Sequence, residues 1–136
     1  MLQDRMMDTK SDMTKSNRTT GGNKSIAVHT TLRLTYGEEK VFGPGLAQLL
    51  EGILEHGSLR RSAAEMNMSY NKAWKIIKNS EAQWGQTLIE RKVGGVHGGG
   101  AVLTAFGQSI LKKYRAFEQQ AEIALCTLVQ EYFGEV

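Results

Sequence analysis

Amide and ammonium side chains recur on one side of a predicted helix that begins after Ser69. An apolar stripe with the i, i+3, i+4, i+7 spacing of a buried face runs along the other side, at Tyr70, Ala73, Trp74 and Ile77. The polar side of the helix holds Asn71, Lys72, Lys75, Lys78 and Asn79. An Asn amide matches the edge of adenine, and a Lys ammonium matches guanine or a phosphate. The pattern therefore indicates a helix that binds nucleic acid.

A second short helix precedes this one, so that the two form a helix-turn-helix. Ser58 can cap the first helix and Ser69 the second. Arg60 and Arg61 open the first helix, where backbone N–H groups also favour phosphate binding. In this docking mode the N-terminal residues of the second helix reach the bases, which selects Tyr70, Asn71, Lys72 and Lys75 as the set facing the groove. Tyr70 also belongs to the apolar stripe, so the alternative for this residue is a position in the core. Trp74 is assigned to the core.

The basic charge of the chain is concentrated in this same segment. Residues 58–97 hold seven Lys or Arg against three Asp or Glu, a surplus of four, while the whole chain has a net charge of +3. Charge and motif coincide, which favours a nucleic-acid partner over an ordinary solvated helix face. Lys78 belongs to this basic set as well.

A strand pair with a glycine-rich connection follows the motif. Residues 87–93 and 101–104 have strand-like sequences, and five of the seven residues at 94–100 are glycine. Arg91 and Lys92 are candidates for contacts to the DNA backbone or the minor groove, with His97 at the tip as a weaker one.

The other elements must position this motif. We expect a flexible tail over residues 1–24, a DNA-binding domain over 25–104 and a long helix over 105–136. A strand over Ile26 to Leu34 should turn at Gly37 and return at Val41, ahead of a helix with an apolar stripe that ends at Gly57. Members of that stripe are Leu46, Leu49, Leu50, Ile53 and Leu54.

The long helix is predicted to join two copies of the chain. Thr104 can cap it, and its apolar residues recur in alternating steps of four and three, the spacing of a coiled-coil seam. A helix of this length exceeds what a small domain can cover, so a homodimer is expected. The predicted interface consists of Ile110, Tyr114, Phe117, Ala121, Ala124 and Leu128.

Three motifs resemble the DNA-binding domain of ModE-type, molybdate-responsive transcriptional regulators. They are Gly57-Ser58-Leu59 with Ala63-Ala64, Met68-Ser69-Tyr70 with Ala73-Trp74, and the glycine-rich tip with Leu103-Thr104 and Gly107. LysR-type regulators share Glu90-Arg91, Leu103-Thr104 and the long helix, but lack that tip. The resemblance implies an α+β, mainly α, winged helix-turn-helix with an N-terminal β-hairpin and a long C-terminal dimerisation helix. It also implies a homodimer on a two-fold symmetric site in double-stranded DNA.

Several other functions receive little support from the sequence. Gly95 and Gly100 have the spacing of a phosphate-binding loop, but Ala101 stands where that loop requires Lys, so no enzyme is expected. The three histidines are isolated from one another, and we expect neither a metal nor another cofactor. Molybdate binding is not expected, because the relevant domains of full-length ModE proteins follow the long helix and this chain ends there.

The remaining alternatives concern how the fold is used. A non-specific architectural DNA-binding protein, or a protein-interaction module, could reuse the winged-helix fold. A single cysteine, Cys126, no apolar signal segment and no membrane-spanning run point to the cytoplasm. The operator, the sign of regulation and any effector are not encoded in these patterns.

Overall fold

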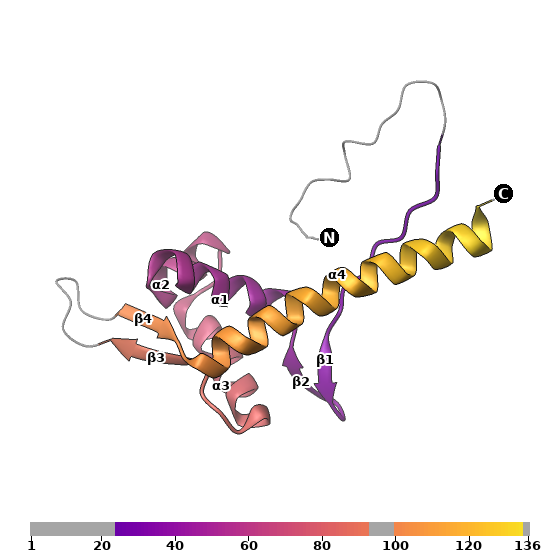
Figure 1. The fold of residues 1–136 in the computed structure, drawn as a ribbon. Helices are drawn as coiled ribbons and strands as arrows, with labels where there is room; N and C mark the ends of the chain where they lie inside the picture. Colours follow the sequence, from indigo (N-terminus) through magenta and orange to yellow (C-terminus); the bar gives the residue numbers. More distant parts are fainter. Residues whose placement is uncertain (1–23, 93–99, 135–136) are drawn as a thin grey trace. The chain divides into compact units, whose positions relative to one another are not determined.

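The computed structural model describes residues 24–92 and 100–134. The elements run β1 (Leu34–Tyr36), β2 (Glu39–Phe42), α1 (Pro44–His56), α2 (Leu59–Glu65), α3 (Tyr70–Trp84), β3 (Ile89–Lys92), β4 (Gly100–Leu103) and α4 (Ala105–Phe133). The chain divides into a unit of residues 32–114 and a second unit that holds the rest. The fold is α+β and mainly α, as predicted, and its strands form two separate pairs (Figure 1). The predicted tail lies almost wholly outside the described residues.

The N-terminal strand pair is shorter than the sequence suggests. β1 pairs antiparallel with β2, with Tyr36 opposite Glu39, and the turn falls at Gly37 as expected. The predicted strand over Ile26 to Leu34 is wrong, because residues 24–33 have no regular secondary structure. β2 has only four residues before Pro44 opens the next helix, so it offers no partner for the earlier β-branched residues. Strand propensity alone does not form a strand without a partner.

Helix α1 supplies the centre of the core. Pro44 stands in its first turn, and Gly57 ends it with a φ of 68°, the left-handed conformation that glycine adopts without strain. Four residues of the predicted stripe are almost fully buried: Leu46, Leu49, Leu50 and Ile53. The fifth, Leu54, is 57% exposed, which corrects the prediction. It is rotated by about 100° from Ile53, beyond the edge of the stripe.

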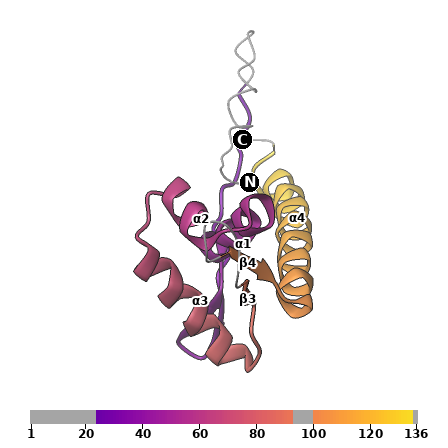
Figure 2. The same cartoon turned by 90° about the vertical axis from the view of Figure 1, so that its left-hand side faces the viewer.

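Helix α2 packs closely on α1. The Ser62 hydroxyl donates a hydrogen bond of 2.8 Å to the Leu49 carbonyl, and a Cβ atom at Gly52 would lie 2.1 Å from the Ser62 oxygen. Glycine at position 52 therefore permits the helices to approach. Figure 2 shows α2 and α3 on the same side of α1.

Strands β3 and β4 are attached at both ends to the helices. They pair antiparallel, with Ile89 opposite Leu103. The Leu88 backbone N–H donates to the Glu81 carboxylate at 2.7 Å, and the Ala101 N–H donates to the Gly57 carbonyl at 2.9 Å. The first bond joins this strand pair, here called the wing, to the end of α3, and the second joins it to the end of α1.

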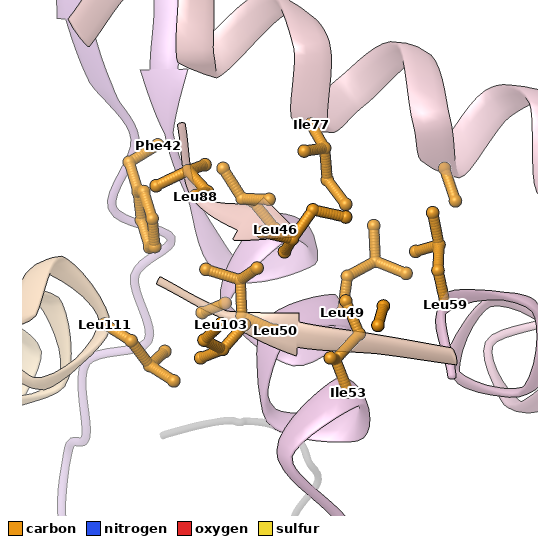
Figure 3. Close-up of a cluster of buried hydrophobic side chains, with 14 of the residues drawn as sticks. Phe42, Leu46, Leu49, Leu50, Ile53, Leu59, Ile77, Leu88, Leu103 and Leu111 are labelled. Carbon is orange, nitrogen blue, oxygen red and sulfur yellow. The ribbon is translucent and has the colours of Figure 1, made fainter. Parts of the chain in front are cut away.

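The N-terminal part of α4 completes the core of the unit 32–114. The Thr104 hydroxyl accepts a hydrogen bond from the Gly107 N–H at 2.9 Å, so the predicted cap is confirmed. Leu111 and Tyr114 are buried, and the Tyr114 hydroxyl donates to the Leu32 carbonyl at 2.7 Å. Figure 3 shows the apolar side chains of helices and strands that meet in this core. In the described residues, no helix combines the length and apolar character needed to cross a bilayer.

Candidate nucleic-acid interface

The polar face predicted on the second helix of the motif is exposed in the structure. Ser69 caps α3, because its hydroxyl accepts a hydrogen bond of 3.1 Å from the Lys72 backbone N–H. Ala73 and Ile77 point into the core and are fully buried. The opposite side is exposed at Asn71, Lys72, Lys75, Lys78 and Asn79. Neither Lys72 nor Lys75 forms an ion pair with another described residue.

Trp74 does not lie in the core, which corrects its assignment. Its side chain is half-buried on the flank of α3 and packs against the edge of the core. Ala73 and Ile77 occupy the inward positions, and Trp74 is rotated by about 100° from Ala73. Two cations lie over the indole ring: the Lys78 ammonium at 4.7 Å and the Arg91 guanidinium, also at 4.7 Å from the ring centre.

Tyr70 stands between the two alternatives that the sequence left open. It is half-buried, and its ring stacks on Trp74 with centres 6.4 Å apart and planes inclined by 5°. The Arg60 guanidinium lies 4.3 Å from the Tyr70 ring centre, and the Tyr70 hydroxyl accepts a 3.0 Å hydrogen bond from Arg91 Nη2. Both the ring and the hydroxyl are therefore engaged within the domain.

The arginines of α2 stand at the edge of this surface. Arg60 and Arg61 are both exposed in the first turn, and Ser58 caps the helix by accepting a 3.0 Å hydrogen bond from the Arg61 N–H. Arg61 Nε also lies 3.8 Å from the Glu65 carboxylate, an exposed pair of small energetic value. Both guanidiniums can therefore reach an external phosphate.

The wing contributes two further cations. Arg91 and Lys92 are exposed on β3, and successive residues of a strand point to opposite faces. Arg91 turns towards α3, where it helps to line a pocket of about 130 Å³ between α2, α3 and the strand pair. His97 and the other tip residues from 93 to 99 lie outside the described residues.

The structure removes Tyr114 from the predicted dimer interface. Its ring is 2% exposed and lies 4.9 Å from that of Phe42, so it already packs within its own domain. Ile110 also packs in part against this core. Further along α4, Phe117, Ala124 and Leu128 are exposed, and Ala121 is half-exposed. Large apolar residues outside the predicted seam are exposed as well, namely Ile123, Tyr132 and Phe133.

Sequence reasoning missed one charged residue, which joins α3 to the start of β3. Glu81 is 7% exposed, and its carboxylate accepts hydrogen bonds from the Leu88 and Ile89 N–H groups at 2.7 and 3.4 Å. Lys78 Nζ lies 3.1 Å from the same carboxylate. Glu81 falls four residues after Ile77, on the inward side of the helix, and this spacing was the available signal. No group of three potential metal ligands gathers among the described residues.

Part of the chain is similar in sequence to known proteins. Residues 46–108 match the family model of the bacterial regulatory helix-turn-helix protein, LysR family. The chain is 38% identical over 89 residues to the molybdenum transport protein ModE of Azotobacter vinelandii, covering 65% of this chain and 33% of that protein. It is 37% identical over 90 residues to the DNA-binding transcriptional dual regulator ModE of Escherichia coli K12, with the same two coverages.

Two further similarities extend this set. The molybdenum-pterin-binding protein MopA of Rhodobacter capsulatus is 33% identical over 81 residues, which cover 60% of this chain and 31% of MopA. The crystal structure of ArgP from Mycobacterium tuberculosis superposes with a TM-score of 0.48 at 25% identity, covering 65% of this chain and 31% of ArgP. The matches span about a third of the length of the ModE and MopA relatives. Over these segments the chain is therefore similar to the LysR-family helix-turn-helix and to part of the ModE and MopA proteins.

Proposed function

We propose that the protein is a sequence-specific transcriptional regulator that binds double-stranded DNA. The observation that carries the proposal is the exposed first part of α3, where Asn71, Lys72 and Lys75 face solvent while Ala73 and Ile77 hold the helix in the core. The similarity to regulators of the ModE type supports the same function. A rigid helix with free amide and ammonium groups is suited to the major groove.

The polar and basic side chains around this helix divide into two roles. Asn71, Lys72 and Lys75 lie on the groove-facing side of α3 and are proposed to contact base edges. Arg60, Arg61 and Lys92 lie on neighbouring elements and are proposed to contact phosphates, which positions the helix without reading sequence. Lys78 is exposed at the flank of the helix, where its ammonium lies over Trp74 and close to Glu81. Because it is away from the groove-facing side, we assign it to the same phosphate-contacting set.

The long helix is proposed to join two copies of the chain. Beyond Tyr114, α4 exposes large apolar side chains, including Phe117 at 46% and Leu128 at 44%. Isolated helices with such faces gain stability when an identical face covers them, and a two-fold dimer is the commonest arrangement. Ile110, Phe117, Ala121, Ala124 and Leu128 remain the proposed seam after the removal of Tyr114.

Selection of bound fragments from random duplex DNA tests both proposals together. We expect an enriched site with two inverted half-sites about one helical turn apart, because a dimer presents two copies of α3. Binding to that site should exceed binding to random duplex by roughly a thousandfold or more at physiological salt. Enrichment of no sequence, together with a steep salt dependence, would instead indicate an architectural protein. A single, non-repeated half-site would contradict the dimer.

A further inference from the structure

We propose that Arg91 is a positioning residue that fixes the wing against α3 through Tyr70 and Trp74. The effect of this positioning on DNA recognition rests on the function proposed above. In this arrangement the guanidinium does not serve chiefly as a phosphate contact. It sets the angle between the strand pair and the recognition helix, and so determines whether both can meet one duplex.

The contacts of Arg91 join two elements that are distant in sequence. Arg91 Nη2 donates to the Tyr70 hydroxyl at 3.0 Å, and the guanidinium carbon lies 4.7 Å from the centre of the Trp74 ring. The two rings are parallel, inclined by only 5°. One side chain of β3 is thereby held by two side chains of the first turns of α3.

Helix α2 contacts the cluster of Arg91, Tyr70 and Trp74 from the other side. The Arg60 guanidinium lies 4.3 Å from the centre of the Tyr70 ring. Together with Arg91, Tyr70 and Trp74 it lines the pocket between the helices and the strand pair, whose walls include Ala101 of β4. Arg60 therefore limits the movement of the ring to which Arg91 binds.

The geometry requires a guanidinium rather than a positive charge alone. A planar guanidinium can lie over an aromatic face and donate a hydrogen bond in a fixed direction at the same time. A lysine ammonium keeps the charge but lacks the plane and the fork of donors. Arg91→Lys thus separates a positioning role from an electrostatic one.

Free protein provides the first test, because it requires no DNA. Hydrogen exchange of the amides paired between β3 and β4 reports local opening of the wing. In Arg91→Lys we expect these amides to exchange about fivefold faster, the effect of losing one exposed cation–π contact and its hydrogen bond. Tyr70→Phe should give a similar increase, and the double variant should exchange no faster than the single ones. Exchange at the wild-type rate in Arg91→Lys, or effects that simply add, would overturn the proposal.

Binding measurements provide the second test. Arg91→Lys should lower affinity for the selected site about fivefold or more, while affinity for random duplex and its salt dependence stay at the wild-type values, because the charge is kept. Lys112→Arg is the matched control, a Lys-to-Arg exchange at an exposed residue of α4 outside the proposed DNA contacts, and it should change neither exchange nor site affinity. An Arg91→Lys protein with wild-type site affinity would contradict the inference. If the wild-type protein showed no preferred site, the regulator function would fail, and the exchange measurement would still decide the role of Arg91.

Discussion

Alanine at position 107 is expected to destabilise the domain more than any other substitution considered for this chain. A Cβ atom on Gly107 would lie 2.2 Å from the Leu88 carbonyl oxygen and 3.1 Å from its carbon. Both are backbone atoms, and the same carbonyl accepts a hydrogen bond from the Thr104 N–H at 2.9 Å. No rotamer change can relieve the clash, so either β3 or the start of α4 must move. We expect a loss of about 3 kcal/mol or more in the free energy of unfolding, at the upper end of overpacking effects.

Urea denaturation followed by circular dichroism measures this loss, and Gly45→Ala is its matched control. Gly45 also lies in the first turn of a helix, but a Cβ atom there would meet nothing within 4 Å. Alanine at 45 should leave stability unchanged or raise it by up to about 1 kcal/mol, because it restricts the unfolded chain. Equal stability of the two variants would show that the approach of α4 to Leu88 is not as tight as the structure has it.

Loss of Lys72 or Lys75 is expected to cause the largest defect in specific binding. Both ammonium groups are exposed on α3 and form no ion pair with the described residues, so their removal leaves the fold intact. Each substitution by alanine should reduce affinity for the selected site by about 1 to 3 kcal/mol, roughly 5- to 150-fold, since one base contact is lost. Titration of labelled duplex at several salt concentrations measures the effect.

Lys92→Ala separates a base contact from a phosphate contact in the same titration. Removal of the Lys92 ammonium should weaken binding to the selected site and to random duplex by the same factor, and lower the salt slope by about one. If Lys72→Ala behaved in this way too, the assignment of Lys72 to the bases would be wrong. Unchanged stability in both alanine variants is expected and should be checked by thermal melting.

Local signals in the sequence predicted most of the helices correctly. Ser58 and Ser69 cap α2 and α3, and Gly57 ends α1, because capping depends on residues within one turn of the helix end. The burial of Ala73 and Ile77 followed from their spacing. Exposure of Lys72 and Lys75 followed in turn, since they lie on the other side of the same helix.

Contacts between distant segments could not be predicted in this way. Trp74 was placed in the core because its spacing matches that of a stripe, but Arg91, 17 residues later, meets its ring outside the core. Tyr114 has the spacing of a coiled-coil seam, yet Phe42 and the Leu32 carbonyl bury it in the domain. Periodicity indicates that a residue is covered, and only the fold decides which segment covers it.

The most direct test of the account is methylation of guanine N7 in the selected duplex by dimethyl sulfate. Guanine N7 lies in the major groove, whereas the adenine N3 atom that the same reagent modifies lies in the minor groove. We predict that bound protein protects guanine N7 atoms in each half-site, and that Lys72→Ala or Lys75→Ala, at saturating protein, restores reactivity at the guanine it contacts. Guanines that stay as reactive as in free DNA, while the protein remains bound, would contradict insertion of α3 into the major groove.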